Sequence, residues 1–319
     1  MYTKGERKVE KLEIIRQHLN SLIVGREKEI DFMLIALLQE GHVLLESVPG
    51  SGKTWMAKAF AGSFQGGFQR LQFTPDVLPS DVTGIRFFNP QTQDFELRPG
   101  AVLTNLLLAD EINRATPRTQ SSLLEAMEEK QATIDGETLQ LPDPFIVIAT
   151  QNPVESQQGT FPLPAAQLDR FLFRLEIGYP SFEEELKIIR DFRGNASHKK
   201  EISAVASVSE VQAWTQAAKK VSIHEDIEHY IIELVQATRK HPLVELGLSS
   251  RAALALVHAA QGRAFIEGRA FVTPDDVKYI LQPVALHRLL LTGEGMLIAK
   301  PEEVLKEIAE SIPMPVEAL

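Results

Sequence analysis

A stretch near position 50, SVPGSGKT, has the residue types and spacing of a loop that binds phosphate. In the pattern G-x-x-x-x-G-K-[ST], backbone N–H groups of a tight loop point at phosphate oxygens, the lysine adds a positive charge and the hydroxyl ligates magnesium. The loop follows the strand-like run HVLLE and precedes the helix-like run TWMAKAF. The sequence therefore predicts a nucleotide site whose contacts include Pro49, Gly50, Ser51, Gly52, Lys53, Thr54 and Trp55.

The first position of this pattern is Ser47 rather than glycine. That position turns the chain out of the strand, and serine is a common turn residue whose hydroxyl can bond locally. Serine costs little if its φ is negative, and about 1–2 kcal/mol if its φ is positive. Either cost is small beside a phosphate site with several N–H donors, so we expect the loop to bind nucleotide.

An acidic pair follows a second apolar run, in NLLLADEINRA at residues 105–115. A phosphate loop that hydrolyses its nucleotide needs such a centre to hold the metal ion and to activate water. We expect Asp110 to hold magnesium together with Thr54, and Glu111 to polarise the attacking water as general base. Without the loop, the same pair would indicate only a solvated strand end or the start of a helix.

These residues must be positioned by a sheet, because the first half of the chain alternates short apolar runs with helical stretches. That alternation is typical of a parallel sheet covered by helices on both faces. After GYPSFEEE the pattern changes to helix-period segments. We therefore predict an α/β domain in residues 1–178 and a smaller all-helical domain in residues 179–319. The expected strands are residues 42–46, 69–73, 105–110, 145–150 and 173–177.

Composition and charge exclude several classes of protein. The chain has no cysteine, which excludes disulfides, thiolate zinc sites, iron-sulfur clusters and cysteine nucleophiles. Its apolar runs are too short to span a bilayer, and its first residues lack the features of a signal peptide, so we expect a cytoplasmic protein. The net charge is -10, and no block of Lys and Arg resembles a nucleic-acid footprint, so nucleic acid is not an expected partner.

Several motifs in order carry a family resemblance. The segments ESVPGSGKT, LLLADEINRATPRTQSSLLEAMEE, FIVIATQNPVE and FPLPAAQLDRFLFRLEIGYPS together resemble the MoxR family of AAA+ ATPases. The resemblance runs from about Leu22 to VTPDDVKYILQPVALHRLLLT, at residues 272–292. It implies a P-loop AAA+ nucleotide domain followed by a helical lid. Ser47 departs from the glycine that is usual in the family.

The resemblance also assigns roles to residues outside the loop. Ile23 and Val24, in IVGR, resemble the segment that lines the adenine pocket, although the same residues could simply lead into a helix. Asn152, in TQNP, resembles sensor 1, which helps to orient the attacking water. Arg170, in QLDRF, resembles the arginine finger that reaches into the site of the next subunit. Arg251, in LSSRAAL, resembles sensor 2 of the lid.

The two arginines have simpler alternatives. Arg170 could form a surface ion pair with Asp169, and Arg251 could be an ordinary first-turn arginine of a helix. Whether Arg251 would act in its own subunit or on a neighbour stays open.

Two further segments resemble family inserts. Residues 74–100 are too long for a simple connection, and NPQT divides two β-like runs, as in the family's insert in the second helix. Residues 131–142 alternate around an Asp-Gly turn signal and resemble the hairpin that precedes sensor 1. In related rings such hairpins face the central pore or a partner. The alternative is that both are surface decorations.

The function implied by the resemblance is hydrolysis of ATP to ADP and phosphate with Mg²⁺, in a homo-oligomeric ring of six subunits. The work done would be chaperone-like remodelling of a client protein, or insertion of a metal or cofactor, with a metal-ion-dependent adhesion domain as a further candidate partner. One alternative is a nucleic-acid motor of the related helicase branch, which the acidic charge disfavours. The other is a non-hydrolysing switch, which Glu111, Asn152 and Arg170 disfavour.

Overall fold

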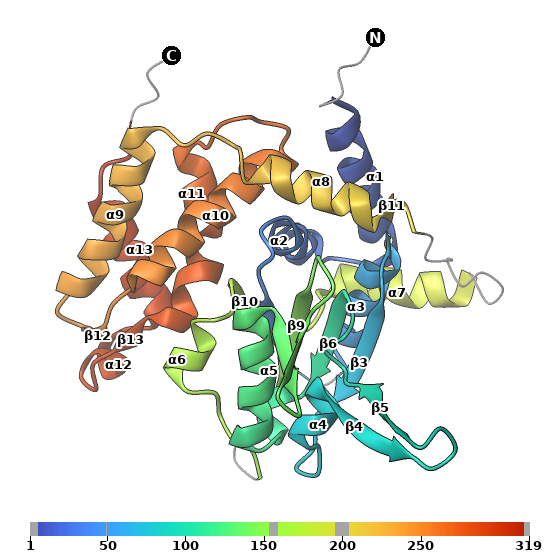
Figure 1. Ribbon diagram of the computed structural model, residues 1–319. Helices are drawn as coiled ribbons and strands as arrows, with labels where there is room; N and C mark the ends of the chain where they lie inside the picture. The colour runs from blue at the N-terminus through green and yellow to red at the C-terminus, as the bar shows by residue number, and fades with distance from the viewer. Residues whose placement is uncertain (1–5, 49, 153–158, 195–203, 316–319) are drawn as a thin grey trace.

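A five-stranded parallel sheet forms the centre of the first half of the chain (Figure 1). The computed structural model describes residues 6–48, 50–152, 159–194 and 204–315. The strand order is β10-β1-β9-β6-β3, and all neighbours are parallel. Each strand lies within one residue of its predicted range, so the α/β prediction is confirmed. The strands are β1 (Val43–Ser47), β3 (Phe68–Gln72), β6 (Leu106–Asp110), β9 (Ile146–Gln151) and β10 (Phe173–Ile177).

Alternate residues of the central strands pack into two separate apolar clusters. Val43 and Leu45 of β1 belong to a cluster with α1 (Glu6–Leu22), α2 (Glu27–Leu38) and α3 (Lys53–Gly62). Leu44 belongs to the other cluster, with Leu123 and Leu124 of α5 (Pro117–Glu129). Because successive strand residues point to opposite faces, α1, α2 and α3 cover one face and α5 covers the other.

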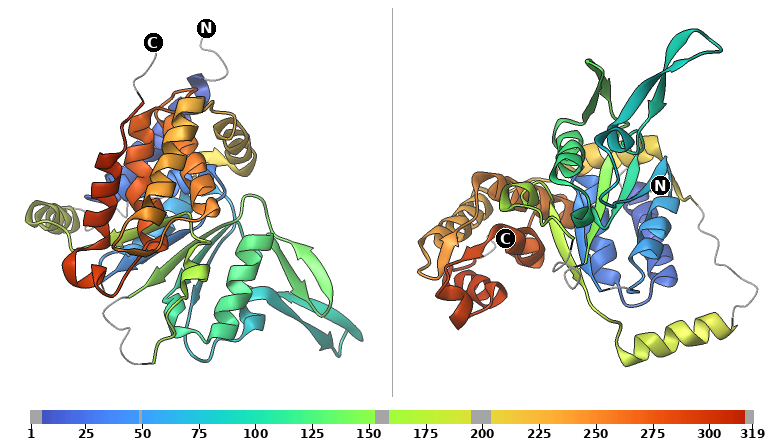
Figure 2. Two further views of the ribbon diagram at one scale, coloured as in Figure 1. Left: turned by 90° about the vertical axis from the view of Figure 1, so that its left-hand side faces the viewer. Right: turned by 90° about the horizontal axis from the view of Figure 1, so that it is seen from below.

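The described residues after Ile177 form a helical lid domain, as predicted, and include three short strands of two or three residues. Figure 1 shows α2 end-on, between the sheet and these helices. Figure 2 shows α7 (Phe182–Gly194) extending away from the sheet and from the other lid helices. The lid elements after α7 are β11 (Ala206–Ser207), α8 (Val208–Ala218), α9 (Glu225–Lys240), β12 (Val244–Leu246), α10 (Ser250–Ile266), α11 (Pro274–Ala285), η2 (Leu286–Arg288), β13 (Leu290–Leu291), α12 (Gly295–Ile298) and α13 (Pro301–Ser311).

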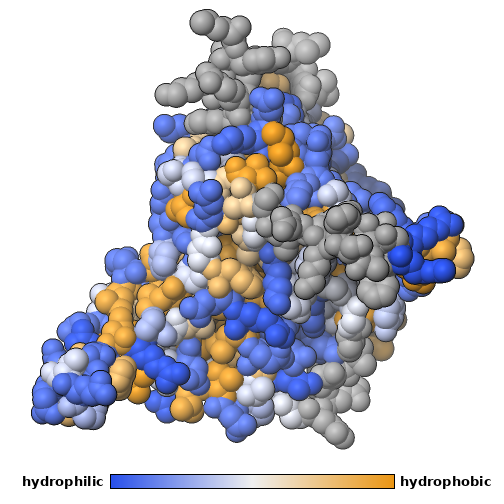
Figure 3. Space-filling view, turned by 90° about the vertical axis from the view of Figure 1, so that its right-hand side faces the viewer, coloured by the Kyte–Doolittle hydropathy of each residue, from blue (hydrophilic) through white to orange (hydrophobic). Residues whose placement is uncertain are grey.

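Two antiparallel hairpins project from the sheet domain. After α4 (Pro79–Thr83), β4 (Gly84–Asn89) pairs with β5 (Asp94–Pro99), and β7 (Gln131–Ile134) pairs with β8 (Glu137–Gln140). An ion pair between Arg86 and Glu137 joins the two hairpins. Apolar side chains are exposed along the first hairpin, which projects at the lower left of Figure 3; they are Ile85, Phe87, Phe88, Phe95 and Leu97.

The remaining elements are short. They are β2 (Phe64–Gln65), which pairs with β11, η1 (Ile112–Arg114) and α6 (Ala165–Leu168). None of the helices in the described parts of the chain is long and apolar enough to cross a membrane.

His42, directly before β1, is a buried ring that joins three elements. Its Nδ1 accepts a hydrogen bond from the Val147 N–H at 3.0 Å, and its Nε2 lies 3.2 Å from the Met127 carbonyl. Neutral histidine with the proton on Nε2 satisfies both contacts. Burial, with a smaller contribution from the Lys130 charge, lowers the pKa of His42 to about 4, although the Met127 carbonyl opposes the shift.

We expect the protein to lose stability as the pH falls from about 6.5 to about 4. In this window the unfolded chain binds a proton at residue 42 and the folded chain does not, so the free energy of unfolding falls by about 3 kcal/mol. Urea unfolding followed by the fluorescence of buried Trp214 measures the effect. His42→Asn should flatten this pH dependence, whereas His229→Asn, a control at an exposed ring, should not. An unchanged slope in His42→Asn would contradict the assignment.

Candidate nucleotide-binding site

The loop between β1 and α3 has the open backbone geometry that phosphate binding needs. Gly50 and Gly52 have φ of 78° and 84°, and a Cβ on either would meet nothing within 4 Å. The side of the loop where a ligand would lie is therefore open, and an L-residue at either position would be strained. Pro49 lies outside the described residues.

Ser47 does not need the freedom of glycine. It is the last residue of β1, pairs with Ile177 and has a φ outside the left-handed region. Serine at this position therefore adopts the backbone conformation that costs it little. Its hydroxyl is buried and has no hydrogen-bond partner among the described residues.

The N-terminus of α3 points its free N–H groups into the loop. The helix begins at Lys53 after Gly52, which has no side chain to cap it, and its first turn carries no acidic residue. The first N–H groups of a helix lack intrahelical partners and carry a partial positive charge. Together with the Lys53 ammonium group, they make this end of α3 a site for an anion.

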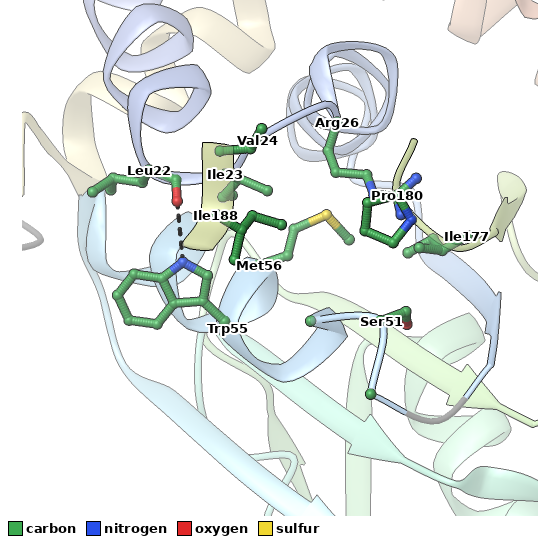
Figure 4. A pocket seen from close by; sticks show the side chains of 12 residues that line it. Leu22, Ile23, Val24, Arg26, Ser51, Trp55, Met56, Ile177, Pro180 and Ile188 are labelled. Atoms are coloured by element: carbon green, nitrogen blue, oxygen red, sulfur yellow. Dashed lines mark hydrogen bonds between the residues drawn. The ribbon is translucent and has the colours of Figure 1, made fainter. Parts of the chain in front are cut away.

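A cavity of about 460 Å³ continues from the loop, which is within the usual size range of small-molecule sites (Figure 4). Trp55 closes one side, and its Nε1 donates a hydrogen bond to the Leu22 carbonyl at 3.3 Å. The apolar wall suits a flat base, with phosphates at the loop. The lining residues are Leu22, Ile23, Val24, Arg26, Gly50, Ser51, Gly52, Trp55, Met56, Ile177, Pro180 and Ile188.

Helix α7 supplies a part of this wall that the sequence reasoning missed. Ile188 lines the cavity, and the neighbouring Ile189 is about half exposed. Arg26 donates a hydrogen bond to the Gly178 carbonyl at 2.6 Å, which ties the segment before α2 to the chain that leads into α7. The apolar residues of α7 could have indicated that this helix covers a cavity, but the sequence does not show which surface they face.

The carboxyl end of β6 carries the acidic pair. Asp110 is buried; its Oδ1 accepts a hydrogen bond from the Thr150 hydroxyl at 2.6 Å, and its Oδ2 pairs with Arg70 at 2.7 Å. Thr150 Oγ1 also accepts the Glu111 N–H at 2.9 Å. Thr150 of β9 therefore fixes both acidic residues, and the sequence reasoning assigned no role to Thr150 or Arg70.

Glu111 has an unusual backbone and a restrained side chain. Its φ is 58°, in the left-handed region, a conformation that is costly outside glycine and that concentrates at functional sites. Its Oε2 accepts a hydrogen bond from Gln72 Nε2 at 2.9 Å and lies 3.1 Å from Arg114 Nε. Gln72 was also missed, although the pairing of β3 with β6 places it beside Asp110.

The sheet brings the loop, the acidic pair and Asn152 to one edge. Asn152 is buried and directly follows β9, which lies between β1 and β6. The carboxyl ends of parallel strands meet at the same edge of a sheet, where ligands of open α/β folds bind. Asp110, Glu111 and Asn152 therefore lie at the ends of strands that finish at the same edge as β1. Lys53 and Thr54 begin the helix after the loop that leaves β1.

Arg170 and Arg251 lie at the opposite edge of the sheet. Arg170 donates to the Leu124 carbonyl of α5 and lies 3.9 Å from Glu128, and Arg251 pairs with the same Glu128 carboxylate. The His42 contact with Met127 places this end of α5 beside the start of β1. Phe173, three residues after Arg170, is level with Val43, which lies about 13 Å along the strand from Ser47.

The alternative pairing of Arg170 with Asp169 is wrong. Asp169 pairs with Arg288 at 2.6 Å, and this buried guanidinium also donates to the carbonyls of Phe171 and Val284. Asp169 is therefore held by the lid, because a buried arginine requires a compensating carboxylate.

Comparison with known proteins identifies the family. The model of the ATPase family associated with various cellular activities (AAA) matches residues 42–173, and the AAA lid domain model matches residues 236–308. A Mycobacterium tuberculosis protein named Chaperone MoxR1 is 40% identical over 304 residues, which cover 92% of this chain and 80% of that protein. The chain belongs to the MoxR family of AAA+ ATPases.

Further relatives match both halves of this MoxR-family chain. A Bacillus subtilis protein named uncharacterized protein YeaC is 48% identical over 303 residues and covers 94% of each chain. A crystal structure from Cytophaga hutchinsonii, of a protein provisionally described as an ATPase, has a TM-score of 0.91 at 36% identity and covers 98% and 97% of the two chains. Family membership and these matches support ATPase activity in general terms.

The MoxR-family site fits a metal ion that arrives with the nucleotide. Among the described residues, no three His, Cys, Asp or Glu side chains could by themselves hold a metal ion. Mg²⁺ commonly uses one or two protein oxygens and completes its shell with phosphates and water. The hydroxyl of Thr54 and the carboxylate of Asp110 provide such oxygens, so the donor set fits Mg²⁺.

Proposed function

We propose that this protein is a Mg²⁺-dependent ATPase that works as a ring of identical subunits. The observation that carries the proposal is the separation of the two edges of the sheet. The carboxyl edge carries the phosphate loop and the acidic pair, and Arg170 and Arg251 share Glu128 at the opposite edge. A head-to-tail ring joins the arginine edge of one subunit to the nucleotide edge of the next.

Within one subunit, each residue of the carboxyl edge has a distinct task. The N–H groups of α3 and the Lys53 ammonium group bind the phosphates, while Thr54 and Asp110 hold Mg²⁺, which supplies charge neutralisation at the phosphates when bound. Glu111 accepts a proton from the attacking water, and Asn152 orients that water. The contacts of Glu111 with Gln72 and Arg114 hold its carboxylate until the site is filled.

Both arginines act on the neighbouring subunit. Their shared contact with Glu128 keeps them at one edge, too far from their own phosphate loop to touch its ligand. The guanidinium of Arg170 stabilises the charge that develops on the transferred phosphoryl group. Arg251, on the first turn of α10, approaches the same nucleotide from the lid. The sequence left open whether Arg251 acts in its own subunit or on a neighbour, and this geometry supports action on a neighbour.

The work performed is the remodelling of a client protein in the cytoplasm by a ring of six subunits. The exposed aromatic residues of the β4–β5 hairpin support a contact with another protein, and one relative is named a chaperone. A metal-ion-dependent adhesion domain is a candidate partner, and insertion of a metal or cofactor is one form that the remodelling would take. The net charge of -10 disfavours a nucleic-acid motor, and the arrangement around Glu111 disfavours a non-hydrolysing switch.

We expect phosphate release from ATP to require Mg²⁺ and to rise, per subunit, with protein concentration. Each complete site needs two subunits, so assembly by mass action sets the number of active sites. A phosphate-release assay across a dilution series, with sedimentation at each concentration, measures both quantities, and EDTA is the control for the metal. Full activity of subunits that sediment as monomers would contradict the proposal.

A further inference from the structure

Asp31 of α2 is a buried carboxylate at the meeting point of four helices. Its side chain is 4% exposed. Arg16 of α1 donates two hydrogen bonds to it, from Nε to Oδ1 and from Nη2 to Oδ2, both 2.6 Å long. Arg263 of α10 donates to Oδ2 at 3.0 Å, and the Tyr279 hydroxyl of α11 donates to Oδ2 at 3.2 Å. One carboxylate therefore joins α1 and α2 to the two lid helices α10 and α11.

Charged groups of both signs surround Asp31. Glu267 accepts from Arg263 at 2.8 Å and lies 3.5 Å from Arg16. Glu13 lies 3.6 Å from Arg16, so two guanidinium groups face three carboxylates. The Arg263 guanidinium also lies over the Tyr279 ring, 3.9 Å from its centre, a favourable cation–π contact. These contacts form a network that is buried at Asp31 and reaches solvent at Arg16 and Glu267.

Close backbone packing accompanies the network. A Cβ on Gly262 of α10 would lie 2.7 Å from Ile35 Cγ2 of α2, so the two helices touch where glycine removes the side chain. Figure 1 shows α2 between the sheet and the lid helices. Packed interiors do not deform continuously, so α10 cannot slide along α2 without breaking the Asp31 contacts.

The network lies between two parts of the proposed reaction site. The chain from α1 to α2 passes through Ile23 and Val24, which line the base cavity. At the far end of α10, Arg251 stands 12 residues before Arg263, about 18 Å along the helix. The Asp31 network therefore fixes the wall of the subunit's own nucleotide cavity relative to the arginine that faces its neighbour.

We propose that Asp31 is a positioning residue for hydrolysis in the neighbouring subunit. It binds the base-lining segment and α10 into one unit, so that a subunit with its own cavity filled holds Arg251 in the orientation that the adjacent nucleotide requires. This inference rests on the proposed function, in which Arg251 acts on a neighbour. Stability alone does not call for such a network, because buried ion pairs are often no more stabilising than apolar residues of similar volume.

Asp31→Asn is expected to lower kcat, with nucleotide affinity nearly unchanged. A displacement of an arginine by about 1 Å can cost 10- to 100-fold in rate, whereas the base wall keeps its own packing. Titration with a fluorescent ATP analogue and phosphate release per assembled ring separate the two effects. The matched control is Asp276→Asn, which removes a buried carboxylate that Arg269 binds within the lid and which should reduce stability while leaving kcat near the native value.

A double-mutant cycle with Arg251→Ala gives the decisive result. If Asp31 acts by placing Arg251, Asp31→Asn should lower kcat in the native background and have no further effect in the Arg251→Ala background. If Asp31→Asn lowers kcat equally in the native and the Arg251→Ala backgrounds, the inference is overturned. It is also overturned if Arg251→Ala is slow but Asp31→Asn has the native kcat. A native kcat in Arg251→Ala would instead show that the proposed role of Arg251 is wrong, and the inference would fall with it.

A milder variant covers the case in which Asp31→Asn does not fold. Tyr279→Phe removes one hydrogen bond of 3.2 Å from the lid side and leaves both ion pairs in place. We expect a reduction in kcat of about threefold, in line with the loss of one such bond, that also disappears in the Arg251→Ala background. A reduction that persists there would overturn the inference.

Discussion

The Arg170→Ala protein is expected to bind ATP with near-native affinity and to release phosphate about 10³-fold more slowly. The affinity should survive because Arg170 contacts Leu124 and Glu128, at the edge opposite its own phosphate loop. The rate should fall because a guanidinium from the adjacent subunit no longer stabilises the charge on the transferred phosphoryl group. Equilibrium titration with a fluorescent ATP analogue and phosphate-release rates at equal assembly measure the two quantities.

Mixing two inactive proteins tests whether the site is shared. A Lys53→Ala subunit still carries Arg170, and an Arg170→Ala subunit still carries an intact loop, so mixed rings contain some complete interfaces and activity should reappear. The matched control replaces Lys53→Ala by the Lys53→Ala/Arg170→Ala double variant, which can complete no interface. If labelled subunits exchange and the first mixture stays inactive, Arg170 has a structural role, in contact with α5 rather than with Asp169.

Lys53→Ala and Glu111→Gln should lose activity in two different ways. In the proposed mechanism Lys53 contacts phosphate in every state, so its removal should abolish detectable binding. Glu111 is proposed to act only on the water, so Glu111→Gln should keep ATP and lose at least about 100-fold in kcat. Nucleotide titration and phosphate release distinguish the two variants. Glu125→Gln, at an exposed carboxylate of α5, is the control for the change of charge.

Native turnover by Glu111→Gln would remove Glu111 from the role of general base. The variant has a second use if it behaves as expected. Because it should hold ATP without hydrolysing it, it should also retain the client protein in a pull-down with ATP. Retention that is equal with and without ATP would argue against a nucleotide-driven cycle on that client.

The sequence by itself determined the strands and predicted the phosphate loop, because both depend on local patterns. A strand buried on both faces must be a nearly continuous apolar run, and β1, β6, β9 and β10 lie where such runs were found. A loop of this pattern binds phosphate mainly through its own backbone, so SVPGSGKT predicts that chemistry without knowledge of distant residues. The change to a helical period likewise predicted the lid.

Only the tertiary structure decided which of the remaining residues act together. The φ of Ser47 settles its fit in the loop, Ile188 reaches the cavity from α7, and Asp31 meets Tyr279 across 248 residues of sequence. The shared contact with Glu128 places Arg170 and Arg251 at the far edge of the sheet. Such contacts leave no local pattern, because a side chain can meet its partner on any element that packs against it; for the buried charge of Asp31 the partners must be groups that donate hydrogen bonds or carry the opposite charge.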